Sequence, residues 1–251
     1  MNWETVKLVI NGFELKAQFS TDNKENIFIP LLQKLSEIKR EKQGRVVAMI
    51  AAPPGVGKST LTAYLEYLSR NTEGLIGIQG LGLDGFHHRS EYLKKTYAMV
   101  NGEQVLLNDV KGCPETFDIE KFISYISSIN NDQLIWPIYD RNLHDVVDHK
   151  IEIVEDIVIV EGNWLLLDEP KWRDCVRYAD VSVFIEAREE RLRDRLIQRK
   201  IQGGKTREEA EQFYLRSDSK NIERVLHHRV DSDVTLELTE YEDYRKKGEK
   251  L

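Results

Sequence analysis

The chain has 251 residues, enough for one domain with a substantial core. Its 41% apolar and 31% charged residues are typical of a globular protein, and its net charge of −7 argues against a general nucleic-acid binder. The two cysteines, Cys113 and Cys175, have no metal-ligand spacing, and no segment has the ~20 apolar residues that span a bilayer. We therefore expect a cytoplasmic protein with no nucleic-acid or membrane partner.

The N-terminal 43 residues are predicted to form a hairpin and a helix. Residues 5–20 alternate apolar and polar side chains around Asn11-Gly12, a dipeptide typical of hairpin turns. A helical pattern follows from about Pro30 and ends near Gly44. We interpret residues 1–43 as an extension and residues 44–251 as the main domain, and we find no chemistry in the extension.

From Arg45 onward, apolar runs alternate with helical patterns. The strand candidates are 46–52, a strand ending near Asp84, 134–140, a strand within 156–167, 181–187 and 233–238. Alternation of this kind predicts an α/β fold with a mostly parallel sheet and helices on both faces. Ligands bind such sheets at the carboxyl ends of the strands, so the residues that follow each run are candidates for the site.

Residues 188–216 are predicted to form a helical lid. The pattern is helical on both sides of Gly203-Gly204, and Thr206 with Glu209 forms a capping box. Four arginines share one face of the first helix: Arg188, Arg191, Arg195 and Arg199. They fit a hinged lid over phosphates, and they also fit a solvated face balanced by acidic neighbours. We expect the last residues, 240–251, to be a frayed end.

The stretch AAPPGVGKST, residues 51–60, is typical of a phosphate-binding loop between a strand and a helix. Ala52 stands where the usual pattern has its first glycine. Gly55 and Gly57 would let backbone N–H groups approach phosphate at the positive end of the helix. The nucleotide-binding set is predicted to be Pro54, Gly55, Val56, Gly57, Lys58, Ser59 and Thr60, with Ser59 also on Mg²⁺.

Asp84 is the candidate acid–base residue. It ends the strand that follows the P-loop helix, where a base for a hydroxyl acceptor would stand. Asp84-Gly85 also fits a simple turn, because Asp-Gly is common in loops. No Asn-Lys-x-Asp motif follows a late strand, and 158–163 reads Val-Ile-Val-Glu-Gly-Asn, so a GTPase or a motor is disfavoured and phosphoryl transfer is favoured.

The chain resembles the P-loop kinases related to uridine kinase, pantothenate kinase and phosphoribulokinase, over roughly residues 45–226. The likeness is greatest to the bacterial nucleoside/nucleotide kinase-like branch, also labelled fructose transport system kinase. It is carried by six motifs in order: APPGVGKST, LDGFHHR, KGCPETFD, PIYDRNLHD, VIVEGNWLLL and VFIEAREERLRDRLIQRK.

The resemblance implies roles for single residues. Asp84 matches the base of the Asp-Gly-Phe motif, and Glu161 matches the Glu-Gly acid that works near Mg²⁺. Arg141 replaces an aromatic residue of the uridine kinase pattern, which weakens the case for base stacking. Tyr139, Asp140, Arg141 and His144 would line the acceptor site, joined by His87 on the loop of the base. Arg191, as a nucleotide contact, and Arg195, as a catalytic residue, fall in the lid region.

We therefore predict a kinase that uses ATP and Mg²⁺ to phosphorylate a hydroxyl of a small metabolite. Asp84, Lys58, Glu161 and Arg195 would carry catalysis. A sugar or sugar-like polyol is the first choice of acceptor, followed by a nucleoside or a pantothenate-like compound. The alternatives are a regulatory or assembly protein controlled by ATP, and simple hydrolysis. A homodimer is compatible with all of these.

Overall fold

The computed structural model describes residues 2–10 and 12–247. At the N-terminus, β1 (Trp3–Ile10) and β2 (Phe13–Ser20) pair antiparallel, as predicted, although Asn11 of the expected turn lies outside the described residues. Short α1 (Thr21–Asn23) and the π-helix η1 (Lys24–Phe28) lead into α2 (Ile29–Glu41). The division into an extension and a main domain stays a prediction.

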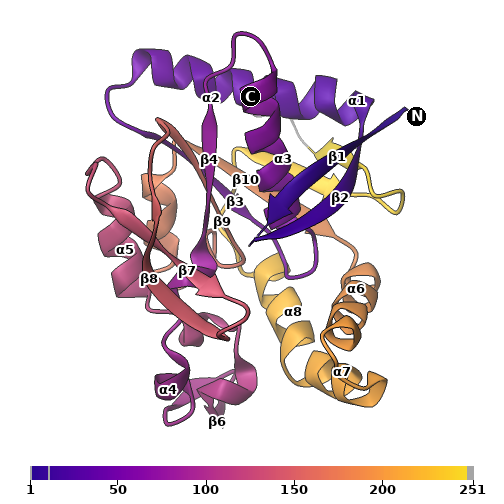
Figure 1. The fold of residues 1–251 in the computed structure, drawn as a ribbon. Coiled ribbons are helices and arrows are strands. Elements are labelled where there is room, and N and C mark those ends of the chain that lie inside the picture. The colour runs from indigo at the N-terminus through magenta and orange to yellow at the C-terminus, as the bar shows by residue number, and fades with distance from the viewer. Residues whose placement is uncertain (1, 11, 248–251) are drawn as a thin grey trace.

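The central sheet has six strands in the order β12-β11-β10-β3-β9-β4 (Figure 1). Their bounds are β3 Val46–Ala51, β4 Ile78–Gly82, β9 Ile157–Gly162, β10 Val181–Ala187, β11 Val234–Leu238 and β12 Tyr244–Lys247. Every neighbouring pair is parallel except β11–β12. This arrangement confirms the predicted α/β class with a mostly parallel sheet.

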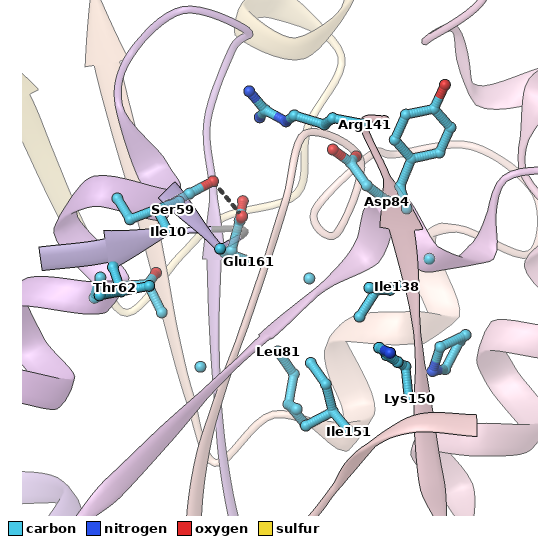
Figure 2. A pocket seen from close by; sticks show the side chains of 18 of the residues that line it. Ile10, Ser59, Thr62, Leu81, Asp84, Ile138, Arg141, Lys150, Ile151 and Glu161 are labelled. Carbon is cyan, nitrogen blue, oxygen red and sulfur yellow. Dashed lines mark hydrogen bonds between the residues drawn. The ribbon is translucent and has the colours of Figure 1, made fainter. Parts of the chain in front are cut away.

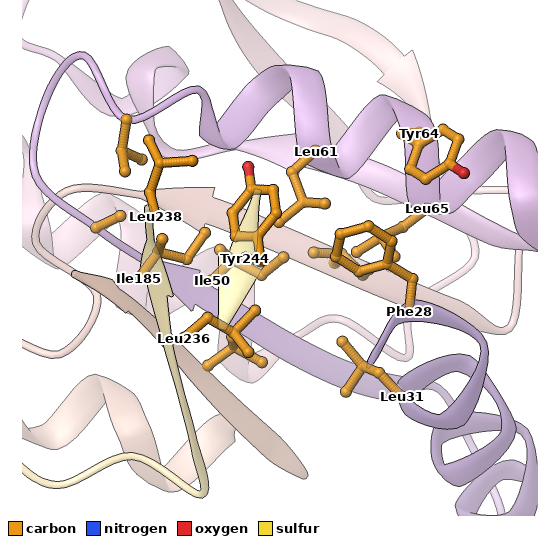
Figure 3. Close-up of a cluster of buried hydrophobic side chains, with 14 of the residues drawn as sticks. Phe28, Leu31, Ile50, Leu61, Tyr64, Leu65, Ile185, Leu236, Leu238 and Tyr244 are labelled. Atoms are coloured by element: carbon orange, nitrogen blue, oxygen red, sulfur yellow. The ribbon is translucent and has the colours of Figure 1, made fainter. Parts of the chain in front are cut away.

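Apolar side chains cover both faces of this sheet. Along β3, Val46, Ala48 and Ile50 join one buried cluster, and the residues between them join the other, because successive strand side chains point to opposite faces. The first cluster packs α2, α3 (Lys58–Asn71) and α6 (Glu189–Gln202), and the second packs α5 (Ile119–Ser127). Phe28 and Tyr244 belong to the first cluster, so the N- and C-terminal segments share one core with α3 (Figure 3).

The predicted strand at 134–140 is a strand, but it does not belong to the central sheet. Instead, β7 (Ile135–Asp140) pairs antiparallel with β8 (Asp145–Glu152) in a separate two-stranded sheet. An apolar run alone does not distinguish a central parallel strand from one arm of a buried hairpin. A second small hairpin, β5 (Tyr97–Val100) and β6 (Glu103–Leu106), follows α4 (Ser90–Leu93).

The remaining helical segments include the predicted lid. Helices α6 and α7 (Arg207–Phe213) flank the glycine pair, the Thr206–Glu209 capping box is present, and the π-helix η6 (Tyr214–Asp218) leads into α8 (Ser219–His227). The 3-10 helices are η2 (Leu83–Phe86), η3 (Leu107–Val110), η4 (Pro114–Thr116) and η5 (Arg173–Tyr178). Within the described chain, no helix combines the length and apolar character needed to cross a membrane.

The expectation of a frayed C-terminus is wrong for part of the segment. Residues Tyr244–Lys247 form the edge strand β12, which Tyr244 anchors in the core. Asn23 adds a two-way link, since its amide donates to Tyr244 O at 2.8 Å and accepts from Tyr244 N at 2.7 Å. The polar composition of the segment concealed this edge strand, and residues 248–251 lie outside the described chain.

Candidate active site

The loop between β3 and α3 has the backbone expected of a phosphate-binding loop. Gly55 and Gly57 have φ values of +85° and +99°, in the left-handed region that glycine adopts without strain, and Gly57 caps α3. A Cβ on Gly55 would lie 3.1 Å from Leu196 Cγ of α6. The loop therefore points backbone N–H groups of the helix start toward one site, with α6 packed against it.

Two residues at the start of α3 contact the end of β9. Lys58 Nζ donates to Asn163 Oδ1 at 2.6 Å and lies 3.4 Å from Pro53 O, while Ser59 Oγ donates to Glu161 Oε1 at 2.5 Å. Because β3 and β9 are parallel neighbours, the loop after β3 and the acid that ends β9 meet at the same edge of the sheet.

The charges at this edge influence one another. Burial lowers the pKa of the Lys58 ammonium, and the carboxylates of Glu161 and Asp84 oppose that shift. Burial raises the pKa of the Glu161 carboxyl, Lys58 opposes the rise, and Asp84 adds to it. Lys58, Glu161 and Asp84 thus form one electrostatic group, although they come from three separate parts of the sequence.

The donor set fits Mg²⁺. The Ser59 hydroxyl and the Glu161 carboxylate, 2.5 Å apart, are hard oxygen ligands of the kind that Mg²⁺ prefers. No cluster of three or more His, Cys, Asp or Glu side chains suited to a metal occurs in residues 2–10 and 12–247. A site with one or two protein ligands is usual where Mg²⁺ is shared with substrate phosphates.

A cavity of about 440 Å³ adjoins these groups (Figure 2). Among the predicted site residues, its lining includes Ser59, Asp84, Tyr139, Arg141 and Glu161. These residues come from α3, η2, the β7 hairpin and β9. The cavity therefore joins the phosphate-binding edge to the candidate base.

Asp84 lies in η2, directly after β4, with its side chain exposed. Its carboxylate accepts no hydrogen bond from any side chain or backbone group of the described residues. Gly85 does not provide a left-handed turn. A Cβ there would lie only 2.2 Å from Pro137 O of β7, so glycine is required for close packing. This geometry disfavours the alternative that Asp84-Gly85 is only a turn.

We expect Gly85→Ala to destabilise the fold, because the methyl group would push the β7 backbone away. The free energy of unfolding should fall by about 1–3 kcal/mol, and the melting temperature by about 2–10 °C. Gly82→Ala is the matched control, since its Cβ would meet nothing closer than Asp84 N at 4.0 Å. Thermal unfolding of both variants tests the packing, and equal melting temperatures would contradict it.

Three predicted acceptor residues lie outside the lining of this cavity. The ring of His87 packs on Phe117, with centroids 3.8 Å apart, and its Nδ1 lies 3.0 Å from Asp84 O. Burial lowers the pKa of His87. Asp140 Oδ1 accepts the N–H groups of its own turn, at 2.8 and 3.1 Å, and His144 is exposed in that turn with φ +52°. Their contact with an acceptor stays a prediction.

The two lid arginines reach the loop and the C-terminal turn. Arg195 donates to Gly55 O and Val56 O, each at 3.1 Å. Arg191 and Arg195 both form ion pairs with Glu242, which lies between β11 and β12. Of these two arginines, Arg195 touches the loop itself, while Arg191 is held beside it through Glu242. Their membership of a lid stays a prediction.

Several residues of this region were not predicted from the sequence. Asn163 follows the Glu-Gly pair directly, so its place at a strand end was a usable signal. Thr62, 4% exposed, lines the cavity one helical turn after the loop, and its hydroxyl has no partner among the described residues. Val9 and Ile10 line the cavity from the N-terminal hairpin. No local pattern indicates that the hairpin reaches the site.

Known proteins resemble this chain over most of its length. Uncharacterized protein YggC of Escherichia coli (strain K12) is 42% identical over 236 residues, which are 94% of this chain and 96% of that protein. "Putative uridine kinase C227.14" of Schizosaccharomyces pombe is 31% identical over 202 residues, 78% of this chain and 84% of that protein. Pantothenate kinases of several bacteria match at 24–28% identity. No family model matches.

Among solved structures, the crystal structure titled "putative fructose transport system kinase" from Silicibacter sp. TM1040 matches with a TM-score of 0.72 and 29% identity. The match covers 83% of this chain and 98% of that chain. This solved structure, the Schizosaccharomyces pombe protein and the bacterial relatives at 24–28% identity all carry the name of a kinase.

Proposed function

We propose that this chain, which belongs to the P-loop kinases related to uridine kinase and pantothenate kinase, transfers the γ-phosphoryl group of ATP to a hydroxyl of a small metabolite. One observation carries the proposal. The exposed carboxylate of Asp84 lines the same cavity as the Ser59–Glu161 pair, next to the loop that holds Lys58. A base and a phosphate-binding loop on one cavity are the parts that this transfer needs.

In this proposal each side chain has a separate task. Asp84 accepts the proton of the acceptor hydroxyl as the oxygen attacks the γ-phosphorus. Lys58 and the loop N–H groups hold the terminal phosphates, and Arg195 of α6 adds positive charge beside them. Ser59 and Glu161 would hold Mg²⁺, which when bound offsets negative charge on the phosphate oxygens.

A sugar or sugar-like polyol remains our first choice of acceptor. Asp84, Tyr139 and Arg141 place a carboxylate, a phenol and a guanidinium around the cavity, and these groups can bind several hydroxyls. A nucleoside or a pantothenate-like compound is the second choice, because relatives of the chain carry those kinase names.

A metabolite screen tests the proposal. The protein is incubated with ATP, Mg²⁺ and pools of sugars, polyols, nucleosides and pantothenate-like alcohols, and the products are examined by mass spectrometry. We expect one class to gain a phosphoryl group. A blank across all pools, from protein that binds ATP, would instead favour an ATP-controlled regulatory protein. Phosphate release that needs no acceptor would favour hydrolysis.

A further inference from the structure

The tip of the N-terminal hairpin forms one wall of the proposed acceptor cavity. Val9, Ile10 and Gly12, here called the hairpin wall, line the cavity that also includes Ser59, Asp84 and Glu161. Figure 2 shows Ile10 on the same side of the cavity as Ser59 and Thr62. A segment without any catalytic motif is thus in position to contact the acceptor.

The base of the hairpin is fixed on α3. The ring of Phe19 stacks on Tyr64, with centroids 3.7 Å apart and planes inclined by 5°. Glu4 accepts a hydrogen bond from the Tyr64 hydroxyl and pairs with Lys24 at 2.7 Å. Because α3 begins at Lys58, the hairpin that carries this wall packs on the same helix that carries Lys58 and Ser59.

The hairpin wall is apolar, and so is the part of the cavity away from the phosphate-binding edge. Val9 is 65% exposed and Ile10 is half-buried, whereas Val6 and Leu8 of the same strand are buried. Figure 2 shows Leu81 and Ile151 toward one end of the cavity, with Asp84 and Arg141 toward the other. An exposed apolar side chain on a cavity wall offers contact area to a ligand.

Besides Asp84, Arg141 and Glu161, two further charged residues line the cavity: Glu66 and Lys150. Neither contradicts the division of the cavity into an apolar end and a polar end. Glu66 is paired with Arg70 at 2.8 Å, so its charge is balanced within α3. Lys150 is exposed, and a lysine can lay its apolar stem along a site while its ammonium stays in water.

We propose that the hairpin wall packs against an apolar part of the acceptor and so helps to select it. The acceptor is then an alcohol that carries an apolar face or substituent near the reacting hydroxyl, and a short polyol without one is a poor ligand. This inference rests on the proposed function, because it takes the cavity to be the acceptor site.

Binding of probe alcohols tests the inference without catalysis. Benzyl alcohol, which has an apolar ring, and glycerol, which has none, are titrated into the full-length protein while NMR follows the amide signals of Ile10, Gly12 and Leu81. We expect saturable shifts with benzyl alcohol and none with glycerol at equal concentration. Absence of saturable shifts at the hairpin amides, or equal binding of the two probes, would overturn the inference.

The variants are Val9→Asn and, as the matched control, Lys7→Asn. Both residues are exposed and lie on the same face of β1, but Lys7 does not line the cavity. Removal of the hairpin is avoided, since it would delete Val6 and Leu8, which are part of the core. We expect Val9→Asn to weaken benzyl alcohol binding about three- to tenfold, through lost apolar contact, and Lys7→Asn to leave it unchanged.

Failure of this inference and failure of the proposed function give different results. If Val9→Asn binds the probe as tightly as the unaltered protein, the role proposed for the hairpin wall is wrong, whatever the enzyme phosphorylates. If probe binding behaves as expected but no acceptor is phosphorylated in the screen, the kinase proposal fails instead. With an identified acceptor, Val9→Asn should raise the KM for the acceptor and leave the KM for ATP unchanged.

Discussion

Replacing Asp84 by Asn should abolish most phosphoryl transfer while leaving ATP binding intact. The amide keeps the shape of the side chain but cannot accept the proton of the acceptor hydroxyl, and general-base catalysis contributes about 10²–10⁴-fold in rate. Asp84 is exposed and makes no side-chain hydrogen bond with the described residues, so the change should not disturb the fold. The measurement is kcat with the acceptor found in the screen, beside an ATP titration.

Asp109→Asn is the control for this variant. Asp109 is also an exposed aspartate in a 3-10 helix, η3, but it does not line the cavity that holds Asp84. Its kcat should match that of the unaltered protein. If Asp84→Asn retained a near-normal rate, another group would have to be the base, and the role assigned to Asp84 would be wrong.

Replacing Lys58 by Ala should have the second largest effect. The ammonium, which donates to Asn163 at 2.6 Å, belongs to the first residue of α3, directly after the loop that would hold the terminal phosphates. Loss of one preorganised charge contact of this kind lowers kcat by about 10²–10³-fold. ATP binding should also weaken, because Lys58 contacts phosphates in the ground state as well.

Lys34→Ala is the control, and it tests whether the loss of any lysine would lower kcat and ATP binding in the same way. Lys34 is exposed on α2 and does not line the cavity that adjoins the loop between β3 and α3. The Lys34 variant should bind ATP and turn over normally. Unchanged ATP titration and turnover in Lys58→Ala would remove the claim that residues 51–60 form a phosphate-binding loop.

The sequence predicted most of the fold because buried parallel strands have a strong pattern. The runs at 46–52, 156–167 and 181–187 became β3, β9 and β10, three neighbouring strands of the sheet. The segment 134–140 became a hairpin strand, because its position depends on β8 and on the contact of Gly85 with the Pro137 backbone. Such pairings are long-range and leave no periodic trace in one segment.

The candidate site was predictable where reactive or polar side chains lie at the end of a strand. Lys58, Ser59 and Asp84 were singled out because each lies just after a strand or at the start of a helix, and Glu161 was singled out through the family resemblance. The structure brings all four to one edge of the sheet. The hairpin wall was not predictable, since it lies about 40 residues before the loop and reaches the cavity through packing on α3. Glu242 was not predicted either, because its ion pairs with Arg191 and Arg195 join segments that are far apart in the sequence.

The most direct test of the central claim is ³¹P NMR of a reaction that contains the protein, ATP, Mg²⁺ and the pooled alcohols. The claim is that the cavity beside the loop transfers phosphate to an alcohol. It predicts a new phosphomonoester signal that grows in step with ADP, and no such signal with Asp84→Asn. Inorganic phosphate in place of the ester, or bound ATP that stays unchanged, would contradict it.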